Sequence, residues 1–164
     1  KFLGMEKKML KAIRNIGFAV IALAMFGANA QAADFSKPVK ARQATMVLKG
    51  FYMGQLAAIA KGKVPYDAKK AQSAANGLLS MATLDGSAMW PPGSGTDKLG
   101  DATRAKPEIW STYPAVAKAG KEHVVAATNM AKVAGNGLEA VQGAIGGLGK
   151  TCGGCHKPFR TKKK

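Results

Sequence analysis

Cysteines, histidines, acidic residues and aromatic residues are all scarce in this chain of 164 residues. Two cysteines cannot build a disulfide framework, which excludes a small fold stapled in several places. Aromatic side chains make up 7% of the chain, and no segment alternates apolar and polar residues for long enough to predict a strand. The nine acidic residues are scattered and there are only two histidines, His123 and His156, so we expect that the protein is not an enzyme. Alanine, lysine, leucine and methionine are frequent, and this composition favours helix.

The first 32 residues have the order of a secretory signal peptide. Basic residues between Lys7 and Arg14 precede twelve uncharged residues from 16 to 27, and Ala30-Gln31-Ala32 has the small-x-small pattern of a cleavage site. Twelve residues rise only about 18 Å as a helix, whereas the hydrocarbon core of a membrane is about 30 Å thick. We therefore expect export without a permanent membrane anchor.

Cleavage after Ala32 would leave residues 33–164 as a single mature domain. A cut after Ala30 satisfies the same rule, so the cleavage point is predicted only to within about two residues. We interpret Met5 as the start of the protein, with residues 1–4 upstream of it.

The chain is strongly basic, with 25 lysines and arginines against 9 acidic residues and a formal net charge of +16. Apart from the tail Lys162-Lys163-Lys164, the lysines are dispersed. For an exported protein we expect this charge to attract an acidic protein partner or an anionic membrane surface, and not nucleic acid.

Four amphipathic helices are predicted after the signal peptide. Such helices bury their apolar faces only against one another, so we expect an all-α fold, an antiparallel up-down-up-down four-helix bundle. In the first helix, a wide apolar stripe that includes Met46, Val47 and Phe51 is expected to face the core. Residues 86–106 are predicted to form a long loop. The helices are expected from a cap at Asp34 or Ser36 to Gly62, from the N-cap Asp67 to Asp85, from Pro107 with a restart at Pro114 to Gly135, and from Leu138 to Phe159.

The motif Cys152-Gly-Gly-Cys155-His156 carries the sharpest chemical signal. Two thiols about one helical turn apart can add to the two vinyl groups of a haem, and the histidine that follows can reach the iron. Three alternatives remain: a redox-active dithiol, a zinc site that takes His123 as a fourth ligand, and a disulfide closing a short loop. Haem attachment of this type takes place outside the bacterial cytoplasmic membrane, which agrees with export and predicts a periplasmic protein.

A haem motif at the end of a secreted four-helix chain resembles the class II c-type cytochromes, which include cytochrome c′. The resemblance covers the whole mature chain, and its more specific points are Arg42-Gln43, residues 63–67, residues 106–110 and residues 152–160. It implies one covalently attached haem c near the C-terminus.

The resemblance also implies roles for individual residues. Cys152 and Cys155 would hold the haem through thioethers, and His156 would be the proximal iron ligand. Arg42, with Gln43 beside it, is expected near a haem propionate, and Arg160 is expected beside the proximal histidine.

The sixth position of the iron decides the function that the resemblance implies. The residue four after the first-helix arginine covers the distal face, and here it is Met46. Low-spin members of the class are similar to this sequence in having a methionine there, so we expect a His/Met six-coordinate haem in a periplasmic electron carrier that passes single electrons between redox partners. The alternatives are Met53 as the ligand, and a five-coordinate cytochrome c′ that binds nitric oxide or other small gases with Met46 as a core residue.

Two further expectations concern self-association of the protein and the role of His123. The family resemblance implies a homodimer formed through the first two helices. His123 is expected to be a solvated or satisfied helix residue with no part in catalysis or metal binding.

Overall fold

A computed structural model describes residues 34–162 of the chain. The predicted signal peptide, residues 1–32, lies outside the described residues, and so do Lys163 and Lys164. Residues from Phe35 onward form one compact unit. Its long helices are α2 (Ser36–Ala60), α3 (Ala68–Thr83), α6 (Tyr113–Val133) and α7 (Leu138–Phe159), joined by the short elements η1 (Ser87–Met89), α4 (Thr96–Leu99), η2 (Gly100–Ala102), α5 (Glu108–Ser111) and η3 (Ala134–Asn136).

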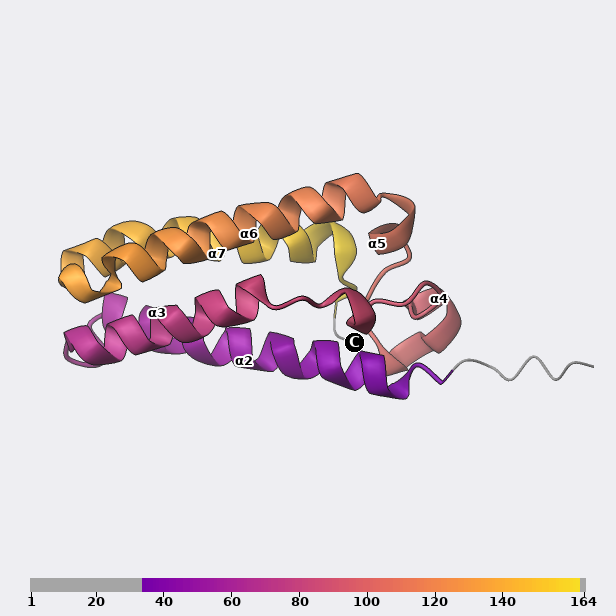
Figure 1. The fold of residues 1–164 in the computed structure, drawn as a ribbon, viewed down its shortest axis with the longest axis horizontal. Coiled ribbons are helices and arrows are strands. Elements are labelled where there is room, and N and C mark those ends of the chain that lie inside the picture. The colour runs from indigo at the N-terminus through magenta and orange to yellow at the C-terminus, as the bar shows by residue number, and fades with distance from the viewer. Residues whose placement is uncertain (1–33, 163–164) are drawn as a thin grey trace, which may run out of the picture. The chain divides into compact units, whose positions relative to one another are not determined.

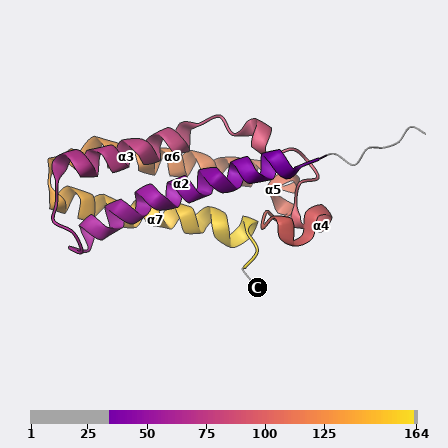
Figure 2. The same cartoon turned by 90° about the horizontal axis from the view of Figure 1, so that it is seen from below.

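The four long helices form the predicted antiparallel bundle. Helix α2 packs against α3 and α7, and α6 packs against the same two helices, so each helix has two neighbours (Figure 1). The turns α2–α3 and α6–α7 lie at one end of the bundle, and α4, α5 and the end of α7 lie at the other (Figure 2). No helix among the described residues is long and apolar enough to cross a membrane.

Most of the predicted helix boundaries are confirmed. Asp67 caps α3 by accepting a hydrogen bond from the backbone N–H of Lys70 at 2.8 Å. Helix α7 has the predicted bounds, and the third helix restarts at Pro114, which lies in the first turn of α6. The predicted cap of the first helix is wrong, because Phe35 occupies the N-cap position and makes no side-chain capping bond.

The connection between α3 and α5 is more ordered than predicted. Instead of one long loop over residues 86–106, it contains η1, α4 and η2. Glycine at position 100 takes a φ of +52°, in the region that favours glycine, where α4 passes into η2. These short turns are held by hydrogen bonds from Arg42 and Gln43 of α2, which are distant from them in the sequence.

Eleven buried side chains form the large core, where all four long helices meet. Alanines of α3 and α6 allow the helices to approach closely, while leucines and Met130 fill the space between them. The members of the large core are Leu56, Ile59, Ala71, Ala74, Ala75, Leu78, Ala127, Met130, Ala134, Val141 and Leu148.

The predicted core stripe of the first helix is wrong at its centre. Val47 is 71% exposed and Phe51 is 58% exposed, whereas Val39 and Leu56 are buried. Helix α2 has apolar residues on more than one side, so helical periodicity alone does not identify the side that packs against α3 and α7.

Candidate functional site

The Cys-Gly-Gly-Cys-His motif occupies the last turns of α7, at the end of the bundle opposite the α2–α3 turn (Figure 1). Cys152, Cys155 and His156 are each partly exposed, and both cysteines are free thiols. The disulfide alternative is therefore absent from this structure. Within residues 34–162 no three histidine, cysteine or acidic side chains gather as a zinc site would require.

A small second core, the motif cluster, surrounds the second cysteine of the motif. Its buried members are Ala105, Ile109 and Phe159, and Trp110 and Cys155 are among the side chains that pack against them. Burial raises the pKa of the Cys155 thiol, with Cys152 adding to this effect and the cations Lys49 and Arg160 opposing it. A raised pKa keeps the Cys155 sulfur in its protonated thiol form.

The end of α7 is joined to the segment before α5 by a short antiparallel seam. The backbone N–H of Lys106 donates to the carbonyl of Phe159 at 3.0 Å, and that of Thr161 donates to the carbonyl of Arg104 at 2.9 Å. Ala105 and Arg160 face each other in this seam. The seam fixes the turn of helix that carries His156, although its two sides lie more than fifty residues apart in the sequence.

His156 is held in an environment that favours a neutral imidazole. Burial lowers its pKa, and the positive charges of Arg160, Arg104 and Lys49 lower it further. The neutral ring is the form that binds a metal ion through a nitrogen lone pair. Arg160 is thus close enough to His156 for its charge to act on the imidazole.

Arg42 ties the α3–α5 connection to α2. It is only 3% exposed, and its guanidinium donates to Met89 O (3.2 Å), Ser94 Oγ (2.7 Å), Ser94 O (2.6 Å) and Thr103 Oγ1 (2.8 Å). The same group lies 4.7 Å from the ring centroid of Trp90. These bonds use the N–H groups of both terminal nitrogens, which leaves Nε–H for any further acceptor. The neighbouring Gln43 makes one exposed bond to the same connection, from Nε2 to Ala102 O at 3.1 Å.

The methionines that could bind the haem iron at its sixth position lie in different surroundings. Met130 is completely buried in the large core, and Met53 packs against that core. Met89 accepts a weak hydrogen bond from Thr45 Oγ1 at 3.6 Å. Met46 is 40% exposed and belongs to neither core cluster of the described residues.

Lys49 was not predicted as a site residue, yet it is partly buried on the inner side of α2. Burial lowers its pKa, and the two cysteines of the motif act in the opposite direction, so all three groups lie within electrostatic reach of one another. Lys49 lies seven residues from each of the buried residues Arg42 and Leu56, so it shares their side of α2. No sequence signal identified it, because α2 has apolar residues on more than one side.

The prediction for His123 was also wrong in part, because this residue faces the motif instead of solvent. Its Nδ1 lies 3.0 Å from Thr151 Oγ1, next to Cys152 in the sequence, and its Nε2 is buried without a hydrogen-bond partner in the described structure. Burial lowers the pKa of His123, and the charges of Lys49 and His156 lower it further. Its spacing from the buried residues Ala127 and Met130 places it on the inner face of α6.

These residues fit a covalently attached haem. Cys152, Cys155 and His156 are the donor set of such a group. The buried Nε2 of His123, beside the motif, has no hydrogen-bond partner in the described structure. Most buried polar atoms in folded proteins have such a partner. A Cβ added at Gly153 or Gly154 would meet nothing within 4 Å, so open space adjoins the motif itself.

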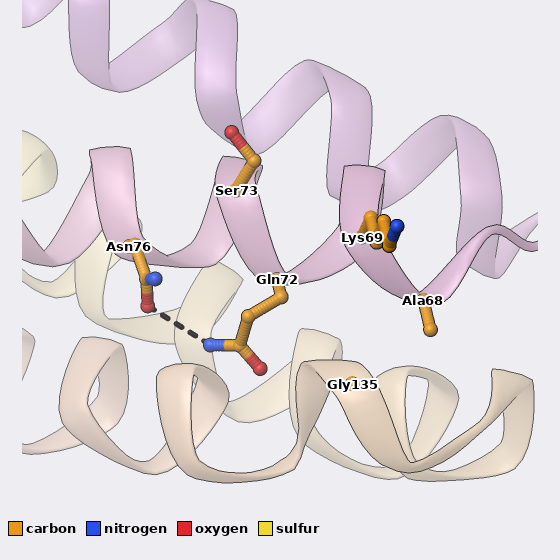
Figure 3. Close-up of a pocket in the computed structure, with 6 residues that line it drawn as sticks. All are labelled: Ala68, Lys69, Gln72, Ser73, Asn76 and Gly135. Atoms are coloured by element: carbon orange, nitrogen blue, oxygen red, sulfur yellow. Dashed lines mark hydrogen bonds between the residues drawn. The ribbon is translucent and has the colours of Figure 1, made fainter.

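An open groove of about 490 Å³ lies far from the motif, along α3 and against η3 (Figure 3). The side-chain amide of Gln72 is hydrogen-bonded within the protein: its Nε2 donates to Asn76 Oδ1 at 2.9 Å and to the backbone carbonyl of Ala131 at 2.8 Å. No cysteine or histidine that could attach a haem lines this groove. The lining residues are Ala68, Lys69, Gln72, Ser73, Asn76 and Gly135.

Comparison with known proteins matches residues 37–160 to a family described as cytochrome c′. A cytochrome c′ of Cereibacter sphaeroides is 35% identical over 141 residues, which cover 86% of this chain and 94% of the relative. A solved cytochrome c′ from Rhodobacter superposes with a TM-score of 0.77 and 34% identity, covering 80% of this chain and all of that one.

Two further solved structures concern the binding of ligands by their own proteins. A cytochrome c′ described as having ligand-controlled dimer dissociation has a TM-score of 0.71 and 34% identity, covering 80% of this chain and 99% of its own. A nitric oxide complex of a cytochrome c prime variant from Alcaligenes xylosoxidans has a TM-score of 0.70 and 27% identity, covering 81% of this chain and all of its own.

Proposed function

Because this chain belongs to the cytochrome c′ family of class II c-type cytochromes and carries one haem c, we propose that it is a periplasmic protein that binds nitric oxide or a similar small gas at its haem. The observation that carries this proposal is the match to cytochromes c′ over most of the chain. Met46, the residue expected over the distal face, is 40% exposed and belongs to neither core cluster of the described residues. The solved nitric oxide complex of a family member supports the same interpretation.

The chain's own residues would hold the haem in three ways. Cys152 and Cys155 would form the thioethers, and the neutral imidazole of His156 would be the proximal ligand. Arg42 would meet a propionate through Nε–H, or by exchanging one of its bonds to the α3–α5 connection. The haem would supply a site for a diatomic ligand and one-electron exchange.

An electron carrier with His/Met ligation is the second candidate, and the position of Met46 favours it. Met46 lies one turn after Arg42 on the side of α2 that the family resemblance assigns to the distal face. The two candidates differ in whether the sulfur binds the iron.

Absorption spectra of the holoprotein in both redox states, with and without carbon monoxide, distinguish the two candidates. We expect a high-spin ferrous spectrum that changes on adding carbon monoxide, and no change of spin state in Met46→Leu. Met53→Leu is the matched control, because it makes the same chemical change at a methionine packed against the large core. A low-spin spectrum in both states that becomes high-spin only in Met46→Leu would establish the electron carrier instead.

We also propose that the protein forms a homodimer through α2. Val47, Leu48 and Phe51 form an exposed apolar patch on this helix, and such patches mark interaction surfaces. Phe51→Glu is expected to convert the dimer to a monomer in sedimentation analysis. Val125→Glu, at an even more exposed position of α6, is expected to leave the dimer intact. A wild-type protein that is monomeric at all concentrations would contradict this proposal.

A further inference from the structure

Lys49 lies on the side of α2 that faces α7. Four residues further along the helix, Met53 points in the same direction, and its Cε lies 3.5 Å from the place that a Cβ on Gly149 of α7 would take. Arg42 and Leu56, seven residues before and after Lys49, are both buried. The side chain of Lys49 is therefore directed toward the helix that carries the motif.

The ammonium group of Lys49 has no carboxylate to neutralise it among the described residues. Within residues 34–162 the single ion pair at 4.0 Å or less joins Lys118 and Glu122, on the outside of α6. The groups that feel the charge of Lys49 are Cys155, His123 and His156, in the motif and beside it. A partly buried cation without a counter-ion costs free energy, so its position calls for a reason.

A haem propionate is a poor candidate for that counter-ion. The propionates leave a haem from the edge opposite the vinyl groups, whereas Lys49 is within electrostatic reach of Cys152 and Cys155, which would bind the vinyl edge. Arg42, the residue expected near a propionate, is seven residues away, which is about 10.5 Å along the helix axis.

His123 does not supply a second positive charge. Thr151 Oγ1 donates its hydrogen to Leu148 O at 2.7 Å, so it accepts from Nδ1–H of His123. Nε2 has no hydrogen-bond partner in the described structure, and burial together with the charges of Lys49 and His156 lowers the pKa of His123, which favours the neutral ring. Lys49 is thus the cation that α2 directs toward the motif.

We propose that Lys49 determines ligand specificity at the haem, by favouring small inorganic anions over neutral ligands on the side that faces α2. This inference rests on the proposed function, which places the haem at the motif. A full positive charge within several ångströms of a bound anion attracts it through a medium of low dielectric, whereas it has little effect on a neutral diatomic molecule. The expected class of ligand includes azide, fluoride and nitrite.

The test compares Lys49→Met with the matched control Lys40→Met, which removes the same charge from an exposed position of the same helix. Azide and fluoride are titrated into the ferric holoprotein, and carbon monoxide into the ferrous holoprotein, each followed by absorption. The reduction potential of each protein is measured without added ligand. In Lys49→Met we expect about tenfold weaker binding of both anions, unchanged binding of carbon monoxide and a lower potential. Lys49→Arg, which keeps the charge, is expected to restore anion binding.

The outcomes separate this inference from the proposed function. If anion affinities and potential in Lys49→Met equal those of Lys40→Met, the inference is overturned even though gas binding stands. If no exogenous ligand binds to any of the proteins, the proposed function fails, and the reduction potential still decides the role of Lys49. A fall in potential confined to Lys49→Met supports its place beside the iron, and equal potentials refute it.

Discussion

The large core and the motif cluster follow each other along α7, yet they are filled in different ways. The large core has eleven buried side chains, all apolar, contributed by every long helix. The motif cluster has three, and charged side chains lie close to it: Arg42 stacks on Trp90, which packs against the cluster, and the charge of Lys49 acts on Cys155 and His156. The difference indicates that one end of the bundle is completed by protein atoms, whereas the other is built to be completed by a cofactor.

The largest expected effect is the loss of the cofactor from the motif end. Replacing both Cys152 and Cys155 with alanine removes the two sulfurs that would form thioethers, so we expect no covalently bound haem at all. The measurements are the mass of the purified chain and its absorption spectrum. Lys150→Ala, at an exposed position of the same helix, is the control, and it is expected to keep its haem.

Hydrogen exchange on the same double variant tests directly whether the two ends differ in this way. Amides of the α3–α5 connection and of the end of α7 are expected to lose protection, while those of α3 and α6 around the large core keep theirs. Equal loss of protection at both ends would show that the large core also depends on the cofactor.

The next effect concerns the large core alone. Leu78→Ala removes a side chain that is 1% exposed, and we expect the free energy of unfolding to fall by about 2–5 kcal/mol. The haem spectrum is expected to stay unchanged, because Leu78 is not a member of the motif cluster. Leu84→Ala, at an exposed position, serves as the control and is expected to cost no more than about 0.5 kcal/mol in denaturant unfolding.

A smaller effect is expected at the polar anchor of the motif end. Arg42→Lys keeps the charge but loses the planar fork that reaches Met89, Ser94 and Thr103, and we expect a cost of roughly 2–3 kcal/mol. Gln43→Ala removes one exposed hydrogen bond from the adjacent residue, and its cost is expected to stay below about 1 kcal/mol. Similar costs for both variants in denaturant unfolding would mean that Arg42 does not anchor the connection.

The smallest effect is expected at the cap of α3. Asp67→Ala removes the acceptor for the N–H of Lys70, which is expected to cost about 1 kcal/mol. Asp67→Asn keeps an acceptor oxygen, so its free energy of unfolding is expected to match that of the wild type. A loss in the asparagine variant equal to that in alanine would assign the effect to the charge and not to the cap.

Local features of the sequence predicted the helices well. Asp67 at an N-cap, Pro114 in a first turn and the limits of α7 all follow from preferences within a few residues of the boundary. The start of α2 was predicted wrongly because two suitable capping residues, Asp34 and Ser36, flank a residue that is not one.

Features that depend on distant contacts were not predicted. The α3–α5 connection is ordered by Arg42, whose partners follow it by 47 to 61 residues, and no local pattern reports such a contact. The inward direction of Lys49 and His123 was missed because polar side chains on a helix are usually placed outside. The motif itself was predicted from its spacing alone, since its chemistry is contained within five consecutive residues.

The seam between residues 104–106 and 159–161 has a practical consequence for attaching this protein to other materials. A linker or fusion joined close after Thr161 would pull on the backbone that aligns His156, because Thr161 itself is bonded across the seam. The turn at Gly62 and Lys63 is exposed, lies at the opposite end of the bundle and makes no contact with the motif (Figure 1). Immobilisation on an electrode or a sensor chip through a cysteine introduced at Lys63 would therefore leave the haem end free and unstrained.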